Sequence, residues 1–162
     1  MWEKIQAIMP DYRLLNVEGC RADKERACFV YSGAEIAGLA ADGALPESVY
    51  AAVSGLSDAD IDYAIGKCRF VAESPEELRR IDRIAAGRNR DGQLASVGLF
   101  LIPTAYDDGR RNGIREADLP ALTEEIRKLS AISVRGCFIQ GSMEGLHGKE
   151  LGRYFRNCYE LA

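Results

Sequence analysis

Short apolar segments alternate with amphipathic segments along most of this chain. The apolar segments are rich in β-branched and aromatic residues, which is typical of β-strands. They predict strands at residues 28–31, 48–53, 69–72, 94–102 and 132–139. The segment at 94–102 is apolar almost throughout, as expected for a strand of a parallel sheet that is covered on both faces.

The intervals between these strands carry helix signals. The clearest begins at residues 74–77, where serine stands at the N-cap, proline at the first helical position and glutamate at the third. An apolar stripe follows at helical spacing; it consists of Leu78, Ile81, Ile84 and Ala85. Further helices are predicted at residues 34–39, after Ser57, and at residues 116–129 and 149–161. Alternation of this kind predicts βαβ units and a parallel sheet.

The remaining segments read as loops or as a lead-in. Residues 104–115 form a polar loop, and residues 141–148 form a glycine-rich loop. Residues 1–27 are an irregular or helical lead-in, with a helix signal at 3–8 and an extra strand signal at 12–17. The 162 residues suit one domain but are fewer than the roughly 200 to 250 of a complete β/α barrel.

Charge and composition narrow the function classes. The net charge of -4 argues against a nucleic-acid-binding surface. No apolar run approaches the ~18 residues of a membrane span, and the N-terminus lacks the apolar core of a signal peptide, so a cytoplasmic protein is expected. The cysteines are odd in number and widely spaced, and His147 is the single histidine. This pattern predicts reduced thiols and no metal site.

Five motifs follow one another from Ser32 to Ser142. They read SGAEI at 32–36, PESVYA at 46–51, AESPEEL at 72–78, RNGI at 111–114 and GCFIQGS at 136–142. In this order they resemble motifs of the barrel domain of the fold-type III pyridoxal-phosphate (PLP) enzymes, which include ornithine, arginine and diaminopimelate decarboxylases and alanine racemase. The resemblance implies an α/β fold, a partial (β/α) barrel of parallel strands with about five or six βα units, in a single domain spanning 1–162.

The resemblance also implies a cofactor site. In the family, the residue matching Glu35 lies in the PLP pocket, and those matching Gly141 and Ser142 lie near its phosphate. Each has a simpler interpretation, which stays open. Glu35 favours the first turn of a helix through the helix dipole. Gly141 and Ser142 form an ordinary strand-to-helix loop, whose backbone N–H groups would still suit an anion.

The sequence departs from the family at the positions that carry the chemistry. The family's Schiff-base lysine lies in a Y-A-V-K-A-N segment; the nearest match, YRLLN at 12–16, has leucines instead. The ring-stacking histidine falls at Ile139, the strand arginine at Phe100 and the aspartate at Phe29. The family's later glycine-rich phosphate loop and its C-terminal β-domain have no counterpart among the 162 residues.

Three functions are therefore considered, and enzymatic activity is left open. The first is a non-catalytic or incomplete relative of PLP-dependent decarboxylases and racemases that binds a phosphate-bearing ligand or a partner chain. The second is a component of a PLP-dependent amino-acid decarboxylase, a lyase, whose lysine comes from another chain. The third is a small-molecule binding module at the strand ends near Ser32, Ser54, Pro103 and Ser142. Exposed sheet edges predict a homo-oligomer or a barrel-completing partner chain.

Other residue groups favour structural interpretations. Asp58, Asp60 and Asp62 fit a solvated helix start better than a metal site. Residues 107–111 combine a turn signal with paired arginines that could grip an anion. His147 lies near Ser142 and Glu144, which suggests nucleophilic chemistry only weakly. An aromatic stripe on the last helix favours core packing first and a subunit interface second; it consists of Tyr154, Phe155 and Tyr159.

Overall fold

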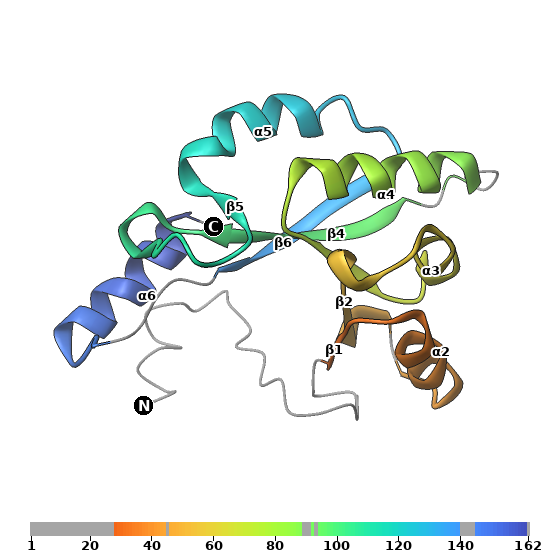
Figure 1. Ribbon diagram of the computed structural model, residues 1–162, viewed down its shortest axis with the longest axis horizontal. Coiled ribbons are helices and arrows are strands. Elements are labelled where there is room, and N and C mark those ends of the chain that lie inside the picture. The colour runs from red at the N-terminus through yellow and green to blue at the C-terminus, as the bar shows by residue number, and fades with distance from the viewer. Residues whose placement is uncertain (1–27, 45, 89–91, 93, 140–144, 162) are drawn as a thin grey trace.

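The computed structural model describes residues 28–44, 46–88, 92, 94–139 and 145–161 (Figure 1). The lead-in at 1–27 lies outside the described residues, as do Gly141 and Ser142.

Parallel strands form one sheet in the order of the sequence. Five strands lie side by side: β1 Cys28–Val30, β2 Val49–Ala52, β3 Arg69–Ala72, β4 Ala95–Ile102 and β6 Ile132–Ile139. A two-residue strand, β5 (Ile114–Arg115), also pairs with β4. Leu101 of β4 pairs with β5 on one side and with β6 on the other, so β5 continues the line of β3 past its end. The described strands do not close into a barrel, and β1 and β6 are the outer strands.

Helices cover the convex face of the sheet (Figure 1). They are α2 Gly33–Ala41, α3 Asp58–Ala64, α4 Pro75–Arg88 and α5 Leu119–Ile126. The last helix, α6 (Lys149–Leu161), stands past the C-terminal ends of the strands (Figure 1). Single 3-10 turns occupy Pro46–Ser48, Val53–Gly55, Thr104–Tyr106 and Glu116–Asp118. This arrangement confirms the predicted fold class, a partial β/α barrel of five or six strands.

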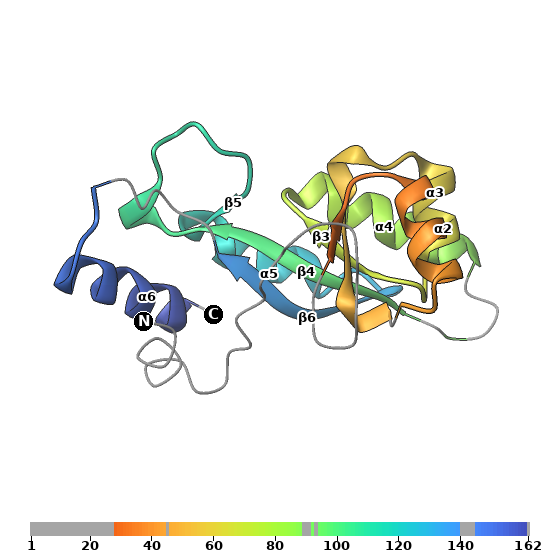
Figure 2. The ribbon, with the colours of Figure 1, turned by 90° about the horizontal axis from the view of Figure 1, so that it is seen from below.

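Alternation along the strands sorts side chains between two faces. Residues such as Val30, Ala51 and Phe70 point toward the helices and join Ile36, Ile61, Leu78 and others in the main core. The intervening positions face the concave side, which Figure 2 views with α5 behind the strands. A second cluster gathers there, made of Phe29, Tyr50, Val71, Phe100 and Phe138.

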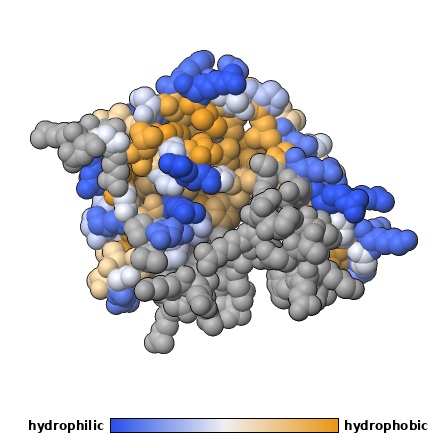
Figure 3. Space-filling view, turned by 180° about the vertical axis from the view of Figure 1, so that it is seen from behind, coloured by the Kyte–Doolittle hydropathy of each residue, from blue (hydrophilic) through white to orange (hydrophobic). Residues whose placement is uncertain are grey.

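The open side of the sheet is apolar. Figure 3, seen from behind, shows apolar side chains gathered in the middle of the view. β6 lies toward this side, and Val134 in it is 36% exposed. Residues of the main core are only partly buried nearby, among them Cys137 and Ile139 of β6. The core therefore reaches the surface where a further βα unit of a barrel would pack.

Candidate functional site

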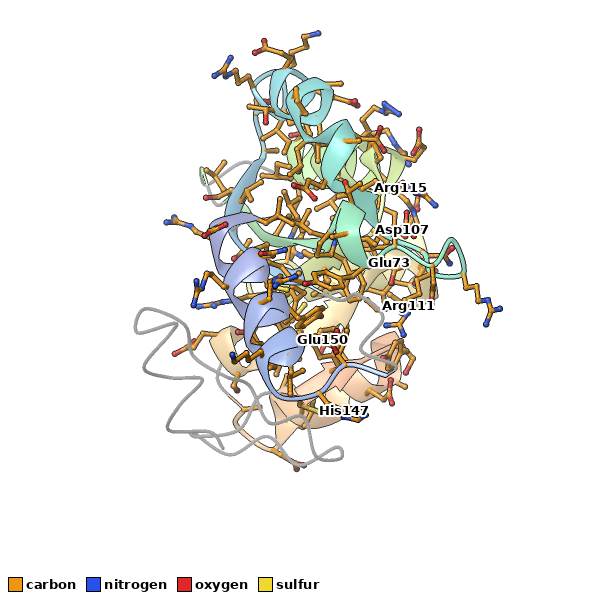
Figure 4. All side chains as sticks on the ribbon, turned by 90° about the vertical axis from the view of Figure 1, so that its left-hand side faces the viewer. Glu73, Asp107, Arg111, Arg115, His147 and Glu150 are labelled. Carbon is orange, nitrogen blue, oxygen red and sulfur yellow. The ribbon has the colours of Figure 1, made fainter. Side chains whose placement is uncertain are left out.

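The C-terminal ends of the parallel strands meet at one edge of the sheet, where α/β proteins place their ligands. Ser32, Ser54 and Pro103 follow β1, β2 and β4 at this edge, as the sequence predicts. Ser142 lies outside the described residues. Figure 4 looks onto this edge and shows a row of charged side chains: Glu73, Asp107, Arg111 and Arg115.

Glu35 lies at this edge and forms hydrogen bonds within its own segment. The Tyr31 backbone N–H donates to Glu35 Oε2 at 2.9 Å, and the Ser32 hydroxyl donates to the same oxygen at 3.0 Å. In return, the Glu35 backbone N–H donates to Ser32 Oγ at 3.3 Å, so that Ser32 caps α2. The Tyr31 N–H is the main reason why the pKa of Glu35 is lowered. A role for Glu35 in a cofactor pocket stays a prediction.

The same arrangement recurs at the next two helices. Asp60 closes a capping box with Ser57 at the start of α3. At α4, the Glu77 backbone N–H donates to Ser74 Oγ, and the Glu77 carboxylate accepts from the Glu73 N–H at 2.7 Å. Burial raises the pKa of Glu77. Three adjacent helix N-termini thus carry a serine hydroxyl on a first-turn N–H and a carboxylate beside it, and the negative charge of these carboxylates disfavours a phosphate at these positions.

The loop after β4 is held by its own ion pairs. Arg115 Nε lies 2.9 Å from Asp107 Oδ2, and Arg111 Nε lies 3.8 Å from Asp108 Oδ2. The Thr104 backbone N–H donates to Glu116 Oε2 at 2.8 Å, which ties the start of the loop to its end. Asp107 also accepts from the Gly109 N–H, as a turn residue does. The turn predicted at 107–111 is therefore present, and its two aspartates pair with Arg111 and Arg115.

The described residues around α6 form no catalytic arrangement. His147 is exposed just before α6, and its carbonyl accepts from the Glu150 N–H at 3.0 Å. Its suggested partners, Ser142 and Glu144, lie outside the described residues. In the aromatic stripe, Tyr154 is 4% exposed and packs edge-on against Tyr106 with ring centroids 4.7 Å apart. Core packing, the first interpretation of the stripe, holds for Tyr154.

Aromatic rings occupy the concave face at positions where the resemblance would place polar groups. Phe29 stacks on Tyr50 at 5.8 Å between centroids, and Phe138 meets Phe29 and Tyr50 edge-on at 5.1 and 5.0 Å. Phe100 packs against the same group. Sequence reasoning noted Phe29 and Phe100 one at a time but did not foresee that they join one cluster. Alternate residues of a strand lie on the same face of the sheet, so marking every second residue of neighbouring strands would have indicated this cluster.

The described residues do not fit a cofactor held as a Schiff base. That bond needs a primary amine within the barrel, and none of the lysines that the structure describes belongs to a strand. Lys67 precedes β3 and donates to the Tyr63 carbonyl, Lys128 follows α5, and Lys149 is exposed at the start of α6. The concave face offers aromatic rings in place of an acidic partner for a pyridine nitrogen.

Metal binding and membrane crossing find no support in the described part of the chain. It contains no group of three or more histidine, cysteine or acidic side chains arranged to hold a metal ion. Asp58 instead pairs with Arg80 at 2.6 Å and with Arg83 at 3.2 Å. Among the described helices, none combines the length and apolar character that a membrane crossing requires.

Comparisons with known proteins agree with the fold. No protein-family model matches the sequence, and no curated protein matches it. Among solved structures, AQ1208 from Aquifex aeolicus superposes with a TM-score of 0.63 at 19% identity, over 87% of this chain and 36% of that one. A diaminopimelate decarboxylase from Helicobacter pylori, complexed with L-lysine, gives 0.63 at 16% identity, over 88% of this chain and 41% of that one.

An alanine racemase from Clostridium difficile gives a TM-score of 0.60 at 21% identity, over 83% of this chain and 34% of that one. This chain thus spans about two fifths or less of the length of these solved structures. The predicted resemblance to part of a decarboxylase and racemase barrel domain is confirmed at the level of the fold.

Proposed function

Because the chain shares part of the decarboxylase and racemase barrel fold, we propose that it is a non-catalytic relative of these PLP-dependent enzymes. We further propose that it works by binding a second polypeptide, either another copy or a different chain, at the open side of its sheet. It would be a pseudoenzyme whose barrel scaffold serves association in place of chemistry.

The aromatic cluster of the concave face carries the first half of this proposal. Phe29, Phe100 and Ile139 stand where the family has an aspartate, an arginine and a histidine. Phenyl rings and an aliphatic side chain neither neutralise a phosphate nor hold a proton at a pyridine nitrogen, so these positions do not supply what the cofactor requires. The rings of Phe29, Tyr50 and Phe138 instead contact one another at 5.0 to 5.8 Å between centroids, which stabilises a filled face.

The outer edge of β6 carries the second half. β6 has eight residues, and no other described strand pairs with its outer edge. An unpaired edge offers backbone N–H and C=O groups to another chain, and the apolar side chains beside it favour burial. The apolar area in Figure 3 lies on this open side. An added βα unit would cover both the edge and the exposed core.

Binding of a phosphate-bearing ligand remains part of the proposal only through Gly141 and Ser142, which lie outside the described residues. At α2, α3 and α4 one first-turn N–H group already donates to a serine hydroxyl, and a carboxylate of the same segment accepts from an N–H just before the helix. A phosphate would have to displace these caps and approach their negative charge. Phosphate binding at the N-termini of α2, α3 and α4 is therefore unfavourable.

Addition of PLP tests the absence of chemistry. The full chain is mixed with PLP, the absorbance of the internal aldimine is recorded, and borohydride is added to trap any adduct for mass spectrometry. We expect only weak labelling shared among exposed lysines. The K149R variant is the control, because Lys149 is the described lysine that begins α6, the helix past the C-terminal ends of the strands. One adduct per chain at a single lysine would contradict the proposal.

The proposed association is tested separately by light scattering over a range of concentrations. We expect a mass above that of one chain, either for the protein alone or after a partner is supplied from the same cells and identified. A monomer that stays alone under both conditions would count against the association and would leave the PLP result untouched.

A second candidate is a PLP-dependent decarboxylase component whose lysine comes from another chain. The open sheet favours it, because a second chain that completes the barrel could also bring the amine to the strand ends. It predicts no trapped adduct on this chain alone and a trapped adduct on the partner within the complex. An unlabelled partner would exclude it.

A further inference from the structure

We propose that the concave face of the sheet binds a small carboxylic acid with an apolar body, through Arg69 and the hydroxyl groups of Ser96 and Ser133. Arg69 begins β3, and the two serines are the second residues of β4 and β6. The site therefore lies near the N-terminal ends of the strands, away from the edge that carries the candidate site. It requires neither PLP nor a second polypeptide, so it stands independently of the proposed function.

The register of the sheet brings these three residues side by side. Phe70 of β3 pairs with Val97 of β4, so the residues before them, Arg69 and Ser96, are also level with each other. Ser96 pairs directly with Ser133 of β6. Neighbouring strands lie ~4.8 Å apart, which keeps the three Cα atoms within about 10 Å. One guanidinium and two hydroxyl groups thus form a row across three strands.

The row belongs to the concave face. The residues next to its members in the chain point toward the helices and belong to the main core; they are Phe70, Ala95, Val97 and Ile132. Because side chains alternate between the faces of a strand, Arg69, Ser96 and Ser133 point to the concave side, which Figure 2 views. All three are half-buried, so a small molecule can reach them.

Arg69 is a half-buried cation without an acidic partner. Its Nη1 donates to the Tyr50 hydroxyl at 3.4 Å, a long hydrogen bond, and its Cζ lies 5.9 Å from the centre of the Tyr50 ring. Among the described residues it forms no ion pair, whereas the half-buried Arg80 pairs with Asp58 at 2.6 Å. A guanidinium has five N–H donors, so most of those on Arg69 are left for a ligand.

The chemistry of the row favours a carboxylate. A planar guanidinium matches a carboxylate through two parallel hydrogen bonds, and a hydroxyl group on either serine can donate a further one. Within the described part of the chain, neither the Ser96 nor the Ser133 hydroxyl has a hydrogen-bond partner. The single positive charge of Arg69 balances one carboxylate. A phosphate group carries about two negative charges near neutral pH and would stay partly uncompensated.

The rings beside Arg69 favour an apolar, best an aromatic, body for the ligand. Tyr50 is 7% exposed and lies beneath the guanidinium, while Phe29 and Phe138 contact Tyr50 and are only half-buried. Gly98 allows Phe138 to lean across the sheet, since a Cβ there would lie 3.0 Å from Phe138 Cε2. A ring placed against the exposed parts of Phe29 and Phe138 gains burial and edge-to-face contact.

Benzoate, acetate and inorganic phosphate are the probes that test the ligand class. The full chain, labelled with ¹⁵N, is titrated with each at equal ionic strength, and the Arg69 Nε–H signal is assigned by its loss in the R69K variant. We expect benzoate to shift this signal to saturation, and acetate to bind about tenfold more weakly because it lacks the ring. An unmoved signal with benzoate, equal affinity for acetate, or tighter binding of phosphate would overturn the proposal.

Substitutions test the residues of the row by benzoate affinity. The R69Q variant removes the charged fork and should weaken binding by about tenfold or more, and S96A and S133A should each weaken it about fivefold. The R127Q variant is the matched control, because Arg127 is exposed at the end of α5 on the convex side, and it should bind as wild type does.

Circular dichroism checks that each variant folds. If R69Q does not fold, R69K takes its place, because lysine keeps the charge but lacks the planar fork and should weaken binding several-fold. Wild-type affinity in the Arg69 variant that folds, or in both serine variants, would contradict the assigned site. So would a loss in R127Q equal to that in the Arg69 variant.

Discussion

At the scale of single residues, Ser32 determines how α2 begins. Its Oγ accepts from the Glu35 N–H, and its hydroxyl donates to the Glu35 carboxylate. Removal of an N-cap hydroxyl costs about 1 kcal/mol of protein stability. The S32A variant should therefore lower the free energy of unfolding by about 1 kcal/mol in urea titrations. The S54A variant is the control, because Ser54 is an exposed serine outside any cap, and equal losses in both would contradict the role of Ser32.

The Glu35 carboxylate makes this cap depend on pH. Its pKa is lowered in the folded state, mainly by the hydrogen bond from the Tyr31 N–H. A lowered folded pKa stabilises the protein above the usual carboxyl pKa of 4.5, and this contribution is lost as pH falls through the folded pKa. The E35Q variant should be less stable than wild type at pH 7, and the difference should vanish in strong acid. A difference that is constant with pH would contradict this assignment.

Two glycines of α2 should respond oppositely to alanine. A Cβ at Gly33 would lie 1.9 Å from Asp60 Oδ1, so the Asp60 capping box of α3 would have to break. A Cβ at Gly38 meets nothing within 4 Å, and alanine is the better helix former. We expect G33A to lose about 1 kcal/mol, the worth of a cap, and G38A to gain about 0.5 to 1 kcal/mol. Thermal unfolding of both variants measures the contrast; a stable G33A would show that Asp60 yields freely.

At the scale of elements, Asp82 joins α4 to the start of β6. Its Oδ1 accepts from the Ala131 backbone N–H at 2.7 Å, and Ala131 is 1% exposed. The D82A variant leaves that buried N–H without its acceptor, which costs about 1 to 3 kcal/mol. The D82N variant keeps an acceptor oxygen and should lose less. Urea titration distinguishes them, and equal losses would mean that the charge, not the hydrogen bond, matters.

The strands and most helices were predictable because their signals are local. Apolar runs predict β4 and β6, and the Ser–Pro–Glu pattern places the start of α4 at Pro75, where the structure has it. The helix predicted at 116–129 is shorter: a 3-10 turn fills Glu116–Asp118, and α5 covers Leu119–Ile126. Glu116 bonds the Thr104 N–H, a contact across the loop that no local pattern contains. β5 was missed for the same reason, since its two residues exist only through pairing with β4.

The candidate site was predictable only in part. Glu35 follows from its motif, but its hydrogen bond to Tyr31 depends on the backbone geometry that follows β1. The aromatic cluster depends on register, because Phe29 pairs with Tyr50 and Phe100 pairs with Phe138 on neighbouring strands. Single positions read along the sequence do not reveal such neighbours. Gly141 and Ser142 stay predictions.

At the scale of the whole molecule, the proposed association would take place at the outer edge of β6. Val134 pairs with Val97 and Gly136 pairs with Gly98, so Arg135 is an extra residue in a bulge. Bulges and charged residues at sheet edges hinder uncontrolled pairing with another edge. The edge therefore combines an unpaired backbone with a charge that selects against indiscriminate partners. A specific partner would have to accommodate Arg135.

Removal of the Arg135 charge should make pairing of the β6 edge with other chains less selective. In the R135V variant the exposed centre of β6 becomes apolar from Val134 to residue 135, so light scattering should show a higher average mass than for wild type at equal concentration. The R135K variant keeps the positive charge and should match wild type. The R127A variant removes an exposed arginine next to α5, away from the sheet edge, and tests whether net charge alone explains the effect. If R127A and R135V associate equally, the bulge plays no special part; if only R135V does, this edge is where the molecule selects its partner.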